Sequence, residues 1–151
     1  MKPIISFLLL AFVLITCGPK KVDTAAEGEK LMQVSREWSQ VVPTKDYDKI
    51  MSYWADDAVI FIPGQATVKG KDAIRTMVDA DSKNPDFNIS WEPLEAHISD
   101  DGSMGFLIEQ NKVTINDSTI FYNNVVTVWR KAADGSWKNV ADISTPKPSE
   151  K

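Results

Sequence analysis

The stretch VVTVWRKAADGSWKNVADIS, residues 125–144, contains the pattern that decides the fold. Its two halves are rich in β-branched and aromatic residues, and Asp134-Gly135 between them is a typical turn pair. The pattern predicts an antiparallel hairpin with one strand over 118–132 and the next over 137–145.

Two earlier turns extend this hairpin into a meander. Asn116-Asp117 separates the hairpin from a β-rich run over 104–115, and the turn 100–102 separates that run from an extended segment over 87–99. Pro93 interrupts the last segment, which predicts a bend or an edge position there. The second half of the chain is therefore an antiparallel sheet.

Helical patterns come before the sheet. Apolar residues recur at helical spacing over 29–42, over the segment that follows Pro43, and again after Gly70, with a short β-rich run at 58–62 between the second and third of these segments. Helices first and strands second is the signature of an α+β fold. We see no internal repeat and no second domain in the sequence.

Composition excludes several classes of function. The 151 residues include one cysteine, Cys17, and one histidine, His97, which rules out an internal disulfide, a multi-Cys/His zinc site and a two-histidine metal motif. We expect no metal and no cofactor. The formal net charge of −4 argues against a nucleic-acid partner, which would require a basic surface.

The N-terminus has the pattern of an export signal. Lys2 precedes a mostly apolar stretch over 4–15 that is too short to span a bilayer as a helix. The following Leu14-Ile15-Thr16-Cys17-Gly18 resembles the lipobox of bacterial lipoproteins, although Thr16 is unusual directly before the cysteine. That resemblance implies acylation of Cys17, a lipid bilayer as partner, and a place in the bacterial cell envelope facing the periplasm or the exterior.

These features predict four segments along the chain. They are a signal peptide over 1–16, a polar tether over 17–28, one globular domain over 29–146 and a polar tail over 147–151.

Several motifs in a common order resemble the nuclear transport factor 2-like superfamily, particularly its SnoaL-like and ketosteroid-isomerase-like domains. They are Trp38, Asp46-Tyr47, the block 53–58 (YWADDA), Gly70 before a helix, and the hairpin residues 128–137. The resemblance implies a cone: a curved antiparallel sheet wrapped by three N-terminal helices around a pocket. The superfamily contains enzymes, ligand binders and interaction modules, so the fold alone does not decide the function.

Position by position, the steroid-isomerase mechanism does not carry over. Where those enzymes place a general-base Asp before the proline that ends the first strand, this chain has Ile62, which cannot accept a proton. Trp38 stands in the place of the oxyanion-hole tyrosine, and Thr127 in that of the second oxyanion-hole acid. Steroid-isomerase activity is therefore not expected.

Strand alternation, with the resemblance to choose the face, predicts a mostly apolar pocket. We expect it to be lined by Trp38, Ile60, Ile62, Phe106, Ile108, Gln110, Asn123, Thr127 and Val140. Asp142 lies on the same predicted face, where burial would raise its pKa and make it a candidate acid/base. The alternative is a structural carboxylate paired with Arg130 or with backbone N–H groups.

Three functions remain open from the sequence. The first is an anchored lipoprotein whose domain binds a small apolar ligand. The second is a cofactor-free isomerase, dehydratase or hydrolase that uses Asp142, and the third is an interaction module that forms a homodimer through the sheet. A ligand pocket around Asp142 would support the first two, and an apolar outer sheet face would support the third.

Overall fold

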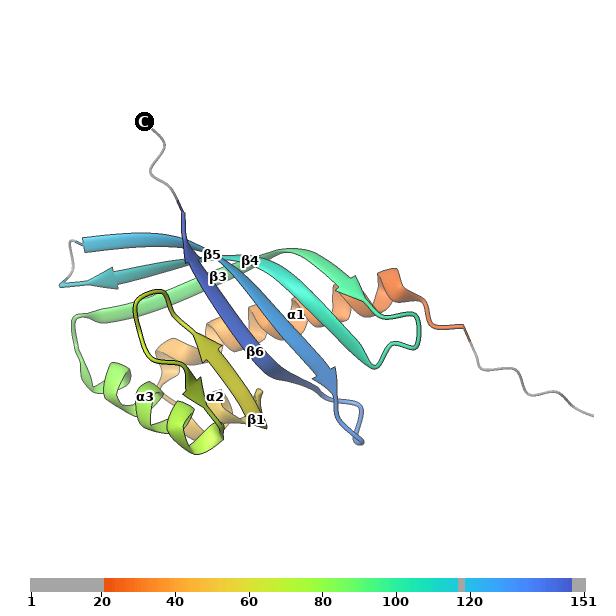
Figure 1. Cartoon of the computed structure of the whole chain (residues 1–151), viewed down its shortest axis with the longest axis horizontal. Coiled ribbons are helices and arrows are strands. Elements are labelled where there is room, and N and C mark those ends of the chain that lie inside the picture. The colour runs from red at the N-terminus through yellow and green to blue at the C-terminus, as the bar shows by residue number, and fades with distance from the viewer. Residues whose placement is uncertain (1–20, 117–118, 148–151) are drawn as a thin grey trace, which may run out of the picture.

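The computed structural model describes residues 21–116 and 119–147. The predicted signal peptide, Cys17 and most of the polar tail lie outside these residues. Within them, helices precede a curved six-stranded sheet with the strand order β2-β1-β6-β5-β4-β3 (Figure 1). The α-helices are α1 (Thr24–Val41), α2 (Tyr47–Ser52) and α3 (Lys71–Lys83), and a short 3-10 helix, Val42–Thr44, follows α1. The strands are β1 (Trp54–Phe61), β2 (Val68–Lys69), β3 (Phe87–Ile98), β4 (Met104–Ile115), β5 (Thr119–Lys131) and β6 (Trp137–Pro146).

The predicted α+β order and the meander are confirmed. Strands β3 to β6 pair antiparallel in sequence order, and a register irregularity lies between Pro93 and Glu95, where the sequence predicted a bend. The sheet is mixed rather than wholly antiparallel, however, because β1 pairs with β6 in parallel. The residue pattern of a single strand does not specify the direction of its neighbour, so this pairing was not visible in the sequence.

Helix α1 begins earlier than predicted. The Asp23 side chain accepts a hydrogen bond from the backbone N–H of Ala26 at 3.0 Å, which caps a helix that starts at Thr24. The last residues of the predicted tether are therefore helical. Gly28 is buried in this first part of the helix, where a Cβ would lie 3.2 Å from the Cβ of Ala96, so glycine allows α1 to approach β3 closely.

Helix α1 crosses one face of the sheet, and α2 and α3 lie beside β1 (Figure 1). We call the face against α1 the inner face; on β4, β5 and β6 its members include Leu107, Thr127 and Asp142, which are register partners. The opposite side is the outer face. No helix in the described part of the chain is long and apolar enough to cross a membrane.

Trp38 of α1 lies at the centre of the core. Its ring stacks on Tyr53 and meets the rings of Trp54, Trp91 and Trp129 edge to face at centroid distances of 5.0–5.6 Å. Edge-to-face contacts between aromatic rings stabilise beyond the area they bury. This aromatic cluster attaches α1 to strands from both halves of the sheet.

Candidate functional site

A buried carboxylate lies at the centre of the inner face. Glu109 of β4 is only 2% exposed. Its Oε1 accepts a hydrogen bond from the Ser35 hydroxyl of α1, and its Oε2 accepts one from the Thr127 hydroxyl of β5 at 2.8 Å. Both carboxylate oxygens are therefore held by side chains from different elements.

Two tryptophans determine the direction of these hydrogen bonds. Trp91 Nε1 donates to Ser35 Oγ, and Trp129 Nε1 donates to Thr127 Oγ1, each at 2.9 Å. An indole N–H can only donate, so each hydroxyl accepts from its tryptophan and has its own proton left for Glu109. The network presents two donors to Glu109, which is the arrangement that a charged carboxylate requires.

Burial and hydrogen bonding act on Glu109 in opposite directions. Burial raises its pKa, and the two hydroxyl donors lower it, with burial the larger influence. Because both oxygens already accept hydrogen bonds, Glu109 holds the charge of the site more readily than a carboxyl without donors.

Asp142 of β6 is such a carboxyl. It is the register partner of Thr127 on one side and of Ile60 on the other, so it lies on the inner face beside Glu109. It is half-buried, and its side chain has no hydrogen bond or ion pair with any residue in the described part of the chain. Burial, reinforced by the negative charge of Glu109, raises the pKa of Asp142 to about 7.

The two carboxyls therefore differ in what they can do. When two acids are neighbours, the ionisation of one raises the pKa of the other, and the acid that has hydrogen-bond donors ionises first. The Glu109 carboxyl accepts hydrogen bonds from two hydroxyl groups, whereas Asp142, with its pKa raised to about 7, has a proton that no described protein group accepts. A group with this pKa can donate a proton to a ligand atom or take one from it.

The structure does not pair Asp142 with Arg130. The guanidinium of Arg130 binds the carboxylate of Asp57 on β1, with N–O distances of 2.7 and 3.2 Å, and both side chains are exposed. Arg130 points to the outer face because it alternates with the inner-facing Trp129. The expected alternative of an Asp142–Arg130 ion pair is therefore wrong.

Six of the nine predicted lining residues lie on the inner face or pack against the core behind it. They are Trp38, Ile60, Ile62, Asn123, Thr127 and Val140. Thr127 is already bonded to Glu109, and Asn123 donates to the side chain of Asn111 at 2.7 Å. Their role toward a ligand stays a prediction.

Phe106, Ile108 and Gln110 lie on the outer face, which corrects the prediction for β4. The register pairs Leu107 with Thr127, so the inner-facing residues of this strand are Leu107 and Glu109. The face was chosen from the family resemblance, and because apolar residues occupy both faces of β4, their alternation gave no independent indication. That choice gave the wrong parity for this strand.

Sequence reasoning also missed Ser35 and Glu109. A signal for Ser35 was present, because it is a polar residue between Leu31 and Trp38 on the apolar stripe of a helix. Glu109 interrupts an otherwise apolar part of β4. No local pattern indicates that the two side chains meet across 74 positions of sequence.

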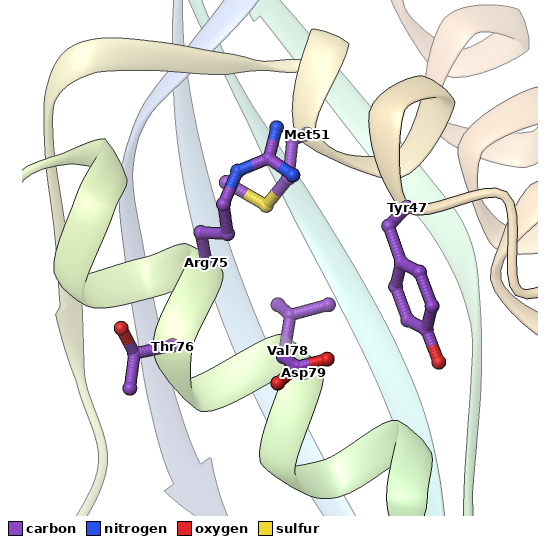
Figure 2. A pocket seen from close by; sticks show the side chains of 6 residues that line it. All are labelled: Tyr47, Met51, Arg75, Thr76, Val78 and Asp79. Carbon is purple, nitrogen blue, oxygen red and sulfur yellow. The ribbon is translucent and has the colours of Figure 1, made fainter.

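Two of the surface hollows formed by described residues are lined by neither Asp142 nor Glu109. One, of about 310 Å³, lies between α2 and α3, where Arg75 extends beside Met51 (Figure 2). The other, of about 450 Å³, lies between α1, α2 and the β5–β6 turn and is lined by several lysines, each close to a carboxylate, a carbonyl or a ring. Within the described residues, no group of three or more His, Cys, Asp or Glu side chains could hold a metal ion.

Comparison with known proteins identifies the relationships of this chain. The model of a family described as the SnoaL-like domain matches residues 31–146. None of the curated proteins matches the chain.

Several solved structures share the fold. A ketosteroid isomerase-like protein from Erwinia carotovora atroseptica is 16% identical, with a TM-score of 0.66 over 84% of this chain and 100% of its own. A nuclear transport factor 2-like protein of unknown function from Pseudomonas putida is 24% identical, with a TM-score of 0.64 over 83% of this chain and 90% of its own. One from Novosphingobium aromaticivorans, with a cystatin-like fold, is 16% identical, with a TM-score of 0.64 over 83% and 85%. At these identities the likeness concerns the fold alone.

Proposed function

Because this chain belongs to the SnoaL-like domain family, whose fold typically forms a ligand-binding pocket, we propose that its inner face binds a small, mostly apolar ligand through Asp142. The observation that carries the proposal is the Asp142 carboxyl itself. It is half-buried, faces the inner side of the sheet and has no partner among the described residues.

The surroundings of Asp142 define the chemistry of the ligand. Its strand neighbour on β1, Ile60, is apolar, and the nearby Thr127 hydroxyl is occupied by Glu109. Beside these two neighbours, the polar function that Asp142 itself offers is its proton, which can bind a carbonyl or hydroxyl oxygen. A negatively charged ligand group is excluded by repulsion from Glu109.

Native mass spectrometry of the protein purified from its own host tests this proposal. Wild-type protein is expected to retain a small molecule, and Asp142→Asn to lose it, because the amide lacks the acidic proton. Asp57→Asn is the matched control, since it makes the same chemical change on the exposed surface and is expected to retain the molecule. Equal retention by wild type and Asp142→Asn would contradict the assignment.

A second candidate function is proton transfer by Asp142, favoured by its pKa of about 7. In its ionised form Asp142 would take a proton from a carbon next to a ligand carbonyl and then return it, without a cofactor. The retained molecule, incubated with the protein in D₂O, would then gain deuterium with wild type and not with Asp142→Asn. Absence of exchange with wild type would leave binding as the function.

A separate candidate role is self-association through the outer face. Phe61, Phe106, Val126 and Ile143 come from β1, β4, β5 and β6, lie on this face and are each between 38% and 43% exposed. A continuous apolar sheet face of this kind favours a protein partner, and a second copy of the chain is the simplest one. Val126→Lys is expected to convert a dimer to a monomer in sedimentation; an unchanged species would contradict this role.

The membrane anchor is also part of the proposal. The lipobox-like sequence before Cys17 supports acylation there, which would attach the domain to the bacterial cell envelope through the segment before α1. Cys17→Ser is expected to move the protein from the membrane fraction to the soluble fraction. Continued membrane association of this variant would refute Cys17 as the anchor.

A further inference from the structure

Four buried side-chain polar atoms in the described part of the chain have no hydrogen-bond partner. They are Nε1 of Trp38, Nε1 of Trp54, and both Nδ2 and Oδ1 of Asn139. Asn139 is fully buried, and the two tryptophans are about 5% exposed. Buried polar groups in folded proteins nearly always have a hydrogen-bond partner, so a cluster of unpaired ones indicates a binding site for a polar group.

The sheet register and the ring contacts bring the residues that carry these atoms close together. Asn139 of β6 is the register partner of Trp54 on β1 and of Trp129 on β5, so its side chain shares their face of the sheet. The Trp38 ring lies against both neighbours, at centroid distances of 5.0 Å from Trp54 and 5.6 Å from Trp129. We call this set of residues, Trp38, Trp54, Trp129 and Asn139, the Trp–Asn cluster.

Other polar groups of the cluster are already paired. The indole of Trp129 donates to Thr127, and the backbone N–H of Asn139 donates to the carbonyl of Tyr53 at 2.8 Å. The unpaired set therefore consists of N–H donors on three residues and one amide oxygen that accepts.

We propose that the Trp–Asn cluster is a binding site for one neutral hydroxyl oxygen, supplied by a water molecule or by the hydroxyl group of a bound ligand. Such an oxygen accepts hydrogen bonds from two N–H groups and donates its own proton to the Asn139 oxygen. An ammonium group cannot accept from the N–H donors. A carboxylate cannot donate to Asn139, and it would add a second negative charge to an inner face that already carries Glu109.

This inference is independent of the ligand proposed at Asp142. A structural water would fill the site whether or not the protein binds anything else, as buried waters commonly do between unpaired polar groups. A ligand hydroxyl would reach the site by extending along β6 from Asp142, three residues away, over about 10 Å.

A crystal structure of the wild-type protein, combined with native mass spectrometry of the same sample, tests the site. We expect electron density for one oxygen within hydrogen-bonding distance of Asn139 and at least one of the two indoles. If the sample carries no added mass, the oxygen is water. If it carries an added mass that Asn139→Leu reduces at least tenfold, the oxygen belongs to a ligand.

Two variants complete the test. Asn139→Leu keeps a similar volume and is expected to lose the oxygen, whereas Asn124→Leu, the same change at an exposed position of β5, is expected to keep it. If Asn139→Leu does not fold, Trp54→Phe removes one donor while retaining an aromatic ring, and it is expected to weaken the density or shift it toward Trp38. An empty cluster in wild type, or an oxygen that survives Asn139→Leu unchanged, would overturn the proposal. Either result would leave the proposal for Asp142 standing, because that proposal is judged by Asp142→Asn.

Discussion

Replacing Asp142 by Asn is expected to stabilise the protein, and to do so more at high pH than at low pH. Unfolded, Asp142 ionises with its ordinary pKa of 3.8; folded, burial and Glu109 raise that pKa to about 7. A raised carboxyl pKa means that stability is lost as pH rises from about 4 to about 7. Asparagine is nearly isosteric and has no charge, so the variant escapes this loss.

The size of the effect follows from the pKa difference. Each pKa unit corresponds to about 1.4 kcal/mol, so the raised pKa of Asp142 lowers the free energy of unfolding by about 4 kcal/mol at pH 8 and by about 1.5 kcal/mol at pH 5. Because solvent reaches part of this half-buried side chain, these are upper values. The Asp142→Asn variant should therefore exceed wild type by an amount that grows by as much as about 2.5 kcal/mol between the two pH values.

Urea denaturation followed by tryptophan fluorescence measures this difference. Asp101→Asn is an informative control, because hydrogen bonds from Ser99 and Ser103 lower the pKa of Asp101 to about 2. A lowered pKa gives stability that is present at neutral pH and lost in acid, so Asp101→Asn should be less stable than wild type at pH 8. A difference between Asp142→Asn and wild type that is the same at pH 5 and pH 8, or an Asp142→Asn variant less stable than wild type at pH 8, would refute the reasoning.

Three other substitutions test the site and its support. Glu109→Gln offers one acceptor to two hydroxyl donors, so its free energy of unfolding in urea denaturation should be about 1–3 kcal/mol lower than that of wild type. It should also lower the pKa of Asp142, measured by carboxyl ¹³C NMR, and an unchanged pKa would contradict the influence of Glu109 on Asp142. Gly105→Ala would place a Cβ 2.6 Å from Cδ1 of Ile98, so the free energy of unfolding of this variant should fall by about 1–3 kcal/mol. A variant as stable as wild type would show that β4 can shift to accommodate the methyl group. Arg130→Ala removes only an exposed pair with Asp57 and should leave the urea midpoint and the pKa of Asp142 unchanged. A change in that pKa would imply a contact between Arg130 and Asp142.

Local patterns predicted the arrangement of the elements well. The strands predicted over 104–115, 118–132 and 137–145 correspond to β4, β5 and β6 to within a residue or so, because Asp, Asn and Gly turn signals lie next to β-branched runs. The family resemblance supplied the curvature and the helices on one face. The parallel pairing of β1 with β6 was beyond such patterns, because it depends on two segments about 80 residues apart.

Asp142 lies on the face of β6 that the family resemblance suggested, whereas the face suggested for β4 was wrong. On β4, Phe106 and Ile108 of the outer face are as apolar as Leu107 of the inner face. The alternation of polar and apolar residues therefore does not indicate which face of this strand is the inner one.

The order of the elements and the family resemblance can be read from the sequence, since turns, caps and periodicity are properties of neighbouring residues. The chemistry of the inner face depends instead on contacts between elements that are distant along the chain. Glu109 is a surface-like residue in the sequence, but the fold buries its carboxyl and directs the hydroxyls of Ser35 and Thr127, from two other elements, at it. The pKa of Asp142 is raised by its burial and by the neighbouring Glu109. Both causes depend on distances in space rather than on positions along the chain.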